Sequence, residues 1–159
     1  MPSIDPVLDD AAQERIAKAL FNLTWTLLDK ENRTVEEDDA MLHMAHASRH
    51  HWGQLHNLPA MGRGEWQCSR VYAVLGRAEP AQHHAQRYLD LCRGNGIGDW
   101  DLGFAYEALA RASAVAGDPA QARSYTEQAL IASEDIKDDE DRELVLSDLE
   151  SIPNQTRFW

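Results

Sequence analysis

The chain contains an internal repeat with a period of 41 residues. Six identities recur at this spacing: Arg70 and Arg111, Ala73 and Ala114, Val74 and Val115, Gly76 and Gly117, Ala81 and Ala122, and Leu89 and Leu130. In each unit a glycine separates two segments with helical periodicity, so the repeated element is predicted to be a helix, a tight turn and a second helix. The repeat therefore favours an all-α fold of stacked antiparallel helical hairpins.

Residues typical of helix ends divide the chain into about seven predicted helices. Asp5 and Pro6 offer a capping oxygen and a first-turn proline for a helix that runs to about Lys30. Thr34 and Glu37 form a capping box that begins a second helix. The third helix is expected to end at 76 and the fourth to begin at 80. The last three helices are expected to cover 99–116, 119–137 and 139–152. No segment has the alternating valine and isoleucine pattern of a strand.

Between Gly53 and Gly64 the chain contains Pro59 and Gly62, and this segment is predicted to be a loop. The length of 159 residues favours one domain with one sizeable core. We therefore predict a single all-helical domain over residues 1–159. Its expected parts are a diverged N-terminal hairpin at 6–58, two hairpins within 62–137, and a C-terminal capping helix at 139–152.

The composition restricts the classes of partner and compartment. The chain has 27 acidic and 15 basic side chains and a net charge of −12, which disfavours nucleic acid. No run of about eighteen apolar residues is present, so no membrane-spanning segment is expected. Cys68 and Cys92 do not form a disulfide framework, and residues 1–10 have no leader-like pattern, so a cytoplasmic location is expected.

Two stretches could form contacts with other molecules. The first predicted helix carries Phe21, Trp25 and Leu28 opposite its main apolar stripe. These residues are the candidate contact of a homodimer. Residues 134–150 hold nine acidic and two basic side chains. We interpret this run as a solvated surface, with an acidic docking patch as the alternative.

The repeated hairpins resemble tetratricopeptide repeats, a family of stacked helical hairpins that mostly hold other proteins or peptides. The small residues of that family's pattern correspond to Ala110, Gly117, Ala122 and Ala129 in the last hairpin, and to Ser69, Tyr72, Gly76 and Ala81 in the preceding one. The resemblance covers about residues 62 to 137. The period of 41 is longer than the 34 residues usual in that family.

The resemblance implies that the first helix of each hairpin lines a concave ligand-binding face. The family's ligand positions then correspond to Arg63, Trp66 and Arg70 in one hairpin, and to Phe104, Glu107 and Arg111 in the next. Arg70 and Arg111 could grip a carboxylate, with Trp66 and Phe104 beside it. The alternative is that Glu107 and Arg111, four residues apart, form an ordinary pair along the helix.

The second predicted helix carries one stripe of potential metal ligands. Glu36, Asp39, His43, His46 and His50 follow one another at spacings of three and four residues. Such neighbours are near enough to share a divalent transition metal such as zinc. The alternatives are a solvent-exposed stripe, or histidines that hydrogen-bond at a helix interface or act as pH-sensitive contacts in a dimer.

Two functions remain open from the sequence. The first is a protein- or peptide-binding module with no cofactor, because no phosphate-binding glycine loop or nucleophile elbow is present. The second is a metal-binding protein or small-molecule enzyme that uses the histidine stripe.

Overall fold

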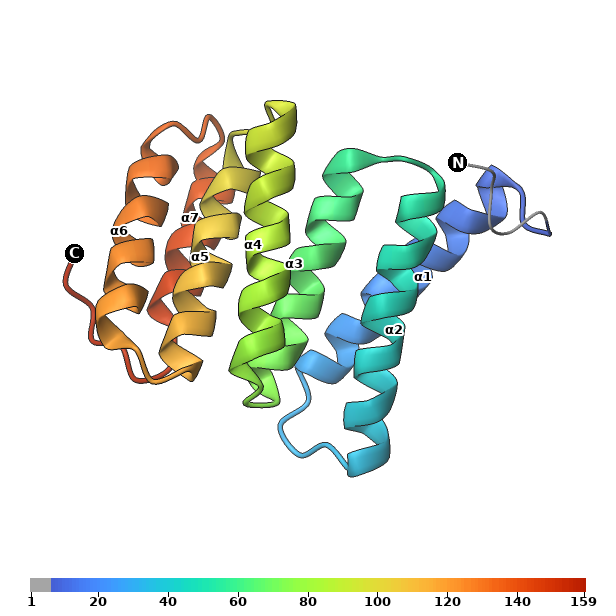
Figure 1. The fold of residues 1–159 in the computed structure, drawn as a ribbon, viewed down its shortest axis with the longest axis horizontal. Helices are drawn as coiled ribbons and strands as arrows, with labels where there is room; N and C mark the ends of the chain where they lie inside the picture. Colours follow the sequence, from blue (N-terminus) through green and yellow to red (C-terminus); the bar gives the residue numbers. More distant parts are fainter. Residues whose placement is uncertain (1–6) are drawn as a thin grey trace.

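The computed structural model describes residues 7–159, and this part of the chain contains seven α-helices and no strand (Figure 1). The predicted all-α fold class is therefore confirmed. The helices are α1 (Asp10–Leu28), α2 (Val35–Gln54), α3 (Leu58–Val74), α4 (Ala78–Asn95), α5 (Trp100–Val115), α6 (Pro119–Glu134) and α7 (Asp139–Glu150).

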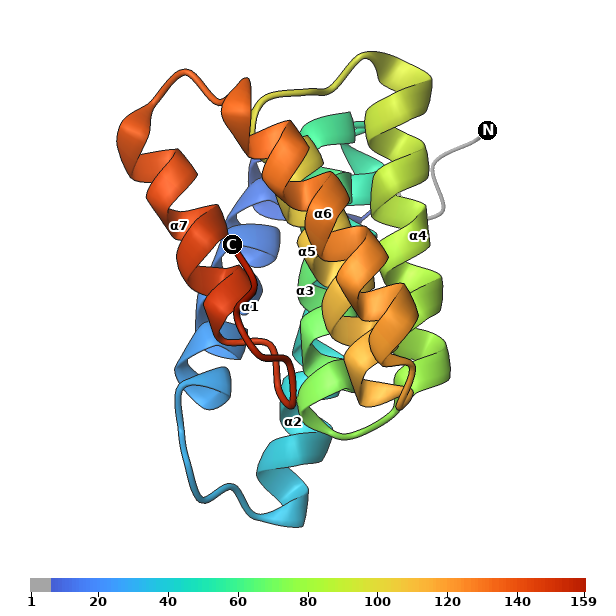
Figure 2. The ribbon, with the colours of Figure 1, turned by 90° about the vertical axis from the view of Figure 1, so that its left-hand side faces the viewer.

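The helices pair as antiparallel hairpins in chain order, and the hairpins stand side by side (Figure 1). α1 pairs with α2, α3 with α4, and α5 with α6. Figure 2 shows α1 and α7 on one side of α3 and α5, with α4 on the other side. We call the side of α3 and α5 that carries α1 and α7 the inner face.

The two hairpins that share the 41-residue repeat turn in the same way. Gly76 and Gly117 have positive φ angles of 73° and 76°, a conformation that glycine adopts without a steric penalty. In the first turn, the backbone N–H of Arg77 donates to Tyr72 O at 2.9 Å. In the second, the N–H of Asp118 donates to Ser113 O at 3.0 Å. The repeated glycines thus mark the same kind of turn, in which a helix ends at a glycine in the left-handed conformation.

α5 has more buried residues than any other helix in the described part of the chain. Eleven of its sixteen residues are buried, as its almost wholly apolar sequence predicts. Alanines make up much of its surface, and these small side chains let α4 and α6 approach closely. The main apolar core lies around α5 between α4, α6 and α7, and a smaller one lies between α1, α2 and α3.

The predicted loop between Gly53 and Gly64 is wrong for most of its length. α3 begins at Leu58, with the side chain of Asn57 as its N-cap. Gly62 and Gly64 lie inside this helix, where they permit close packing rather than a turn. A Cβ atom at Gly62 would stand 2.8 Å from the Tyr88 ring, and one at Gly64 would stand 3.0 Å from Arg49 Cδ.

Helix ends at the N-terminal side agree with the sequence in one case and differ in another. The capping box of Thr34 and Glu37 is present, so that prediction is confirmed. α1 begins at Asp10, with Asp9 as its N-cap, and ends at Leu28. The predicted cap at Asp5 and Pro6 lies outside the described residues.

α7 packs against α5 and α6 on the inner face. Val145, Leu149 and Ile152 are buried there, as predicted. Gly103 of α5 makes room for this contact, because a Cβ atom at that position would stand 3.3 Å from a methyl carbon of Val145. The capping helix predicted from the sequence therefore covers one face of the stack.

Both cysteines are in the state that the sequence predicts. Cys68 and Cys92 are both buried free thiols. Across residues 7–159, no helix combines the length and the apolar character needed to cross a bilayer.

Candidate functional site

A pocket lined by aromatic side chains opens on the inner face beside α1. Its volume is about 290 Å³, and its surface is predominantly apolar. We call it the aromatic pocket, and its lining consists of Phe21 and Trp25 from α1, Arg63 and Trp66 from α3, Tyr88 from α4, and Trp100 and Phe104 from α5. Three hairpins thus contribute to one concave site.

The rings of this pocket form a continuous row across the first helices of the hairpins. The ring centroids of Trp25 and Trp66 lie 5.3 Å apart, and those of Trp66 and Phe104 lie 5.5 Å apart. Trp100 follows at 6.0 Å from Phe104. These tilted and edge-to-face arrangements are the favoured geometries for aromatic pairs and hold the walls of the pocket in place.

Arg63 is the charged side chain of the aromatic pocket. Its Nε and Nη2 atoms each lie 3.2 Å from a carboxylate oxygen of Asp101, and its guanidinium stands 4.2 Å from the centre of the Trp100 ring. The buried hydroxyl of Tyr88 donates to the same carboxylate. Among the described residues, none accepts a hydrogen bond from Nη1 of Arg63. This nitrogen is held in a fixed position and can donate to a ligand.

A second pocket adjoins the first and shares Phe21 and Arg63 with it. It has a volume of about 440 Å³ and a more polar lining. Its remaining residues are Glu14, Lys18, Asn22, Trp52, Asn57 and Ala60. The two pockets together give the α1 side of the inner face an apolar part and a polar part.

On the other half of the inner face, charged residues bind one another. We call Arg70, Glu107, Arg111 and Asp148 the ion network. Glu107 Oε1 lies 2.7 Å from Arg111 Nε and 3.4 Å from Arg70 Nη2. Arg70 Nη2 also lies 2.9 Å from Asp148 Oδ2 of α7. Trp66 links this network to the aromatic pocket, because its indole N–H donates to Glu107 Oε2 at 3.4 Å.

Arg111 holds the end of α7. Its Nη2 donates to Asp148 O at 2.8 Å and to Ser151 Oγ at 2.7 Å, and its Nη1 donates to Ser151 O at 3.3 Å. Burial acts to raise the pKa of the fully buried Glu107, but Arg111 and Arg70 outweigh it and hold the pKa below its ordinary value. Burial and the nearby Glu107 raise the pKa of Asp148.

The six predicted ligand contacts therefore divide into two groups. Arg63, Trp66 and Phe104 line the aromatic pocket. Arg70, Glu107 and Arg111 belong to the ion network, where the carboxylates that the arginines bind come from the chain itself. The alternative interpretation of Glu107 and Arg111 as a pair four residues apart is the one present in the structure.

The predicted stripe of metal ligands is not assembled into a site. Within residues 7–159, no three His, Cys, Asp or Glu side chains are grouped so that they could hold a metal ion. Asp39, His43 and His50 are exposed on α2, whereas His46 is half-buried and points towards α3. Since the side chains diverge, the stripe does not converge on one ion.

His46 instead takes part in a polar cluster between α2, α3 and α4, as one of the alternatives predicted. Its Nε2 lies 2.9 Å from the Tyr72 hydroxyl, and its Nδ1 lies 3.8 Å from Cys68 Sγ. Its ring centroid is 5.2 Å from that of His84. The Nδ1 atom of His84 lies 2.6 Å from Oε2 of the buried Glu65.

The residues predicted for a homodimer contact other parts of their own chain. Phe21 and Trp25 line the aromatic pocket. Leu28 packs against the core between α1, α2 and α3. The second apolar side of α1 thus faces the aromatic pocket and α3 of its own chain, and the homodimer stays a prediction.

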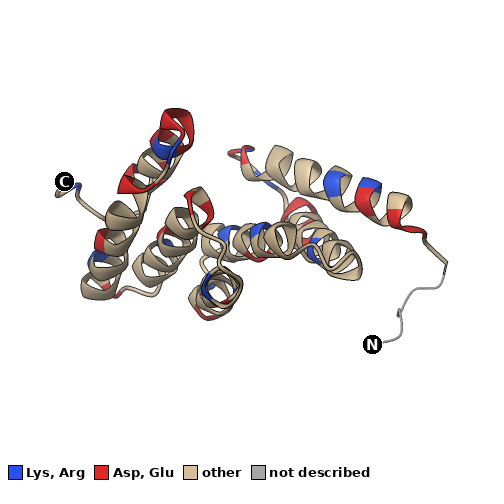
Figure 3. Cartoon of the chain, turned by 90° about the horizontal axis from the view of Figure 1, so that it is seen from above, with Lys and Arg blue, Asp and Glu red and all other residues tan. Residues whose placement is uncertain are grey.

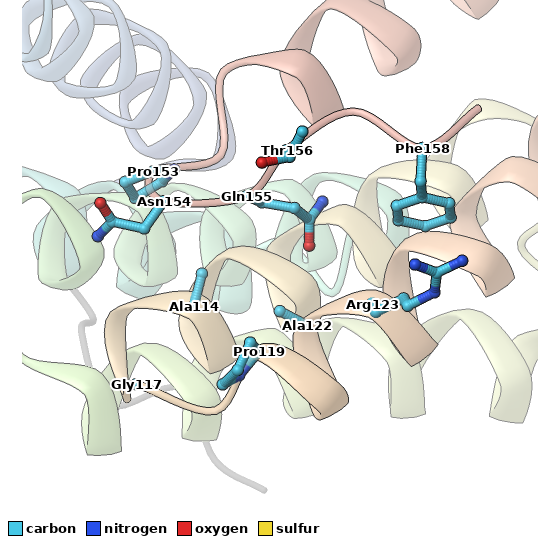
Figure 4. Close-up of a pocket in the computed structure, with 10 residues that line it drawn as sticks. All are labelled: Ala114, Gly117, Pro119, Ala122, Arg123, Pro153, Asn154, Gln155, Thr156 and Phe158. Carbon is cyan, nitrogen blue, oxygen red and sulfur yellow. The ribbon is translucent and has the colours of Figure 1, made fainter.

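A third pocket, of about 430 Å³, lies where the C-terminal tail crosses the turn between α5 and α6 (Figure 4). Figure 4 shows the side chains of Gln155 and Phe158 directed towards α6. Gln155 Nε2 donates to Thr126 Oγ1 at 2.9 Å, and the Arg123 guanidinium stands 4.0 Å from the Phe158 ring centre. The side chains of Gln155 and Phe158 are therefore engaged by α6 of the same chain.

Sequence reasoning missed Tyr88, Trp100 and Asp101 as parts of the site. One signal was available for Trp100, because it stands four residues before Phe104, as Phe21 stands four before Trp25. Aromatic pairs at this spacing on first helices indicate a shared face. Tyr88 and Asp101 gave no such signal, since their roles depend on contacts between different helices.

Comparisons with protein-family models, curated proteins and solved structures found no match to this chain. The likeness to tetratricopeptide repeats therefore rests on its repeated residues.

Proposed function

We propose that this chain is a protein- or peptide-binding module of the cytoplasm, related in design to tetratricopeptide repeats, and that it binds its partner on the inner face beside α1. The aromatic pocket is the observation that carries this proposal. Buried free thiols at Cys68 and Cys92 support a reducing compartment.

The chemistry of the aromatic pocket favours recognition of an apolar side chain. Concave sites with predominantly apolar walls and a few oriented polar groups are the usual form of ligand sites. Tryptophan and arginine are also enriched among residues that dominate binding energy at protein interfaces. Here Trp25, Trp66 and Trp100 surround the site, and Arg63 supplies one oriented donor for a backbone carbonyl of the partner.

The nucleophilic side chains near the inner helices support binding rather than catalysis. Burial raises the pKa of the Cys68 thiol to about 12, so this thiol stays protonated at neutral pH. The Ser69 hydroxyl is buried and donates to Ala81 O at 2.8 Å. Both groups thus have the properties of structural residues.

The proposal is tested by selecting peptides from a random displayed library on the intact protein. Selected peptides are then measured against Trp25→Ala, which removes one wall of the aromatic pocket. The matched control is Leu23→Ala, since Leu23 lies on the same helix, is 51% exposed and lines none of the three pockets described above. Circular dichroism checks that both variants fold.

We expect selected peptides to bind Trp25→Ala at least tenfold more weakly than the parent, and to bind Leu23→Ala as well as the parent. Peptides that bind both variants equally well would place recognition elsewhere and would reject the aromatic pocket as the site.

A further inference from the structure

The arginines at and beside the aromatic pocket already have carboxylate partners within the chain. Arg63 already pairs with Asp101, and Arg70 already pairs with Glu107 and Asp148. These arginines also lie over the indole rings, with Arg63 at 4.2 Å from the Trp100 centre and Arg70 at 5.3 Å from the Trp66 centre. Because these rings already contact a cation, the pocket suits an uncharged apolar side chain.

A group of acidic side chains lies next to one end of this pocket. Asp99 caps α5 and immediately precedes Trp100, which lines the pocket. Reduced hydration raises the pKa of Asp141 at the start of α7, and the charges of Asp138, Asp99 and Glu140 raise it further. The start of α7 is close to the start of α5, because Gly103 in the first turns of α5 faces Val145, which lies about one turn after Asp141 on α7. Figure 3 shows the dense group of acidic residues at this end of α7.

These carboxylates lack cationic partners. Within residues 7–159, no ion pair is formed by Asp99, Asp138, Glu140 or Asp141. We call these four residues the acidic rim. The net charge of −12 acts in the same direction at longer range. A basic partner would be attracted by the whole chain and then oriented by the rim.

From this arrangement we infer the chemistry of the partner, an inference that rests on the proposed function. The inner face binds a basic segment of another protein, which places one large apolar side chain in the aromatic pocket and adjacent lysine or arginine side chains at the acidic rim. The apolar contact provides the affinity, and the charges select the segment and its direction. The surface run of acidic residues is then a docking patch as well as a solvated surface.

The inference is tested with three synthetic twelve-residue peptides labelled with fluorescein. Each has one central tryptophan, and its flanking residues are lysine in the first, serine in the second and glutamate in the third. Binding is measured by fluorescence anisotropy at low and at high salt. We expect the lysine peptide to bind at least tenfold more tightly than the serine peptide and to weaken with salt, and the glutamate peptide to bind least.

Two double variants locate the charge effect on the protein. Asp99→Asn with Asp141→Asn removes two charges of the acidic rim, and asparagine at 99 can still cap α5. Glu79→Gln with Asp90→Asn removes the same charge from exposed positions on α4, on the other side of the molecule. The rim variant should bind the lysine peptide at least fivefold more weakly, and the α4 variant should stay within twofold of the parent.

Each opposite result overturns the inference. Equal binding of the three peptides would show that charge does not select the partner, and equal losses in the two double variants would show that net charge acts without the rim. If library peptides depend on Trp25 but are not enriched in lysine and arginine, the proposed function stands and this inference fails. If no peptide depends on Trp25, the proposed function itself fails.

Discussion

The two halves of the inner face use similar residues in opposite ways. Beside α7, Arg111 of α5 is buried and Arg70 of α3 is partly buried, and both are bound to carboxylates or carbonyls of the chain. Beside α1, Trp66 of α3 and Trp100 and Phe104 of α5 line an open pocket. The difference is the seventh helix, which packs against α5 and α6 in the first half and lines no part of the aromatic pocket in the second. Figure 2 shows α7 and α1 on the same side of the molecule.

This comparison shows which half depends on exact complementarity. A buried ion pair is stable only when every member has its partner, because an unpaired buried charge costs several kcal/mol. An apolar pocket carries no such penalty and can accept side chains of different shape. The covered half should therefore respond strongly to single substitutions, and the open half more mildly.

The largest expected effect is at Glu107 in the covered half. Glu107→Gln keeps the size of the side chain but removes the charge that faces Arg70 and Arg111, so we expect a loss of about 3 kcal/mol or more in the free energy of unfolding. Urea denaturation followed by circular dichroism measures it. The matched control is Glu127→Gln, since Glu127 pairs with Arg123 at the same spacing but on the surface.

For that exposed control pair we expect a change below about 0.5 kcal/mol. Similar losses in the two variants would mean that burial does not distinguish the ion network from an ordinary surface pair.

The next effect tests whether α7 is an integral cover of the inner face. Leu149 is buried at 1% exposure, so Leu149→Ala should lower the free energy of unfolding by about 2–4 kcal/mol. Leu144 lies on the same helix at 58% exposure, and Leu144→Ala should change it by less than about 0.5 kcal/mol. Chemical denaturation of both variants checks this. A small loss at Leu149 would show that α7 is only loosely attached.

The sequence predicted most of the local structure of this fold. The 41-residue repeat located two hairpins, because Gly76 and Gly117 are residues that a left-handed helix end requires. The capping box at Thr34 and Glu37 located the start of α2 for a similar reason. Such signals depend on residues within a few positions of one another, so one sequence is enough to read them.

The sequence could not predict the features that depend on distant contacts. Arg70 and Asp148 are 78 residues apart, and no local pattern shows that α7 brings them together. The sequence predicts a loop at Gly62, because the close approach of the Tyr88 ring, which requires glycine there, comes from another helix. Three of the seven residues of the aromatic pocket, Arg63, Trp66 and Phe104, were predicted as ligand contacts. The positions of Tyr88 and Trp100 depend on how α4 and α5 pack beside α3.

A third, intermediate effect tests the contact between Gly62 of α3 and Tyr88 of α4, which lines the aromatic pocket. Gly62→Ala would place a Cβ atom 2.8 Å from the Tyr88 ring, so we expect a loss of about 1–3 kcal/mol in the free energy of unfolding. Peptide binding should weaken as well, because Tyr88 lines the aromatic pocket. Gly94 is the control, since a Cβ atom there meets nothing within 4 Å.

Gly94→Ala should raise the stability by about 0.5 kcal/mol, because alanine favours the helix. If Gly62→Ala does not change the free energy of unfolding, α3 and α4 can move apart, and the Tyr88 side of the aromatic pocket can adapt to a ligand.

The smallest expected effect is at His46, which is half-buried in the polar cluster between α2, α3 and α4. Burial is the largest cause that lowers its pKa below 6.5, followed by the neighbouring charge of His84; Glu65 acts in the opposite direction, and His43 adds a smaller lowering. Its other neighbours on α3, Cys68 and Tyr72, contact the ring nitrogens. The unfolded chain therefore takes up a proton on His46 at a higher pH than the folded chain does.

The sign of the pH dependence follows from this difference. When the unfolded state binds more protons, stability rises with pH, so the contribution of His46 is complete above pH 6.5 and declines as the pH falls below it. Burial raises the pKa of Glu65, but His84 and Arg49 outweigh it and lower that pKa from 4.5, so the loss from Glu65 comes at still lower pH. Urea midpoints at pH 7.5, 6.5 and 5.5 should fall in the parent and stay more nearly constant in His46→Gln. If both proteins follow the same curve, protonation of His46 does not change the stability, and a nuclear magnetic resonance titration would then place the pKa of His46 at its ordinary value of 6.5.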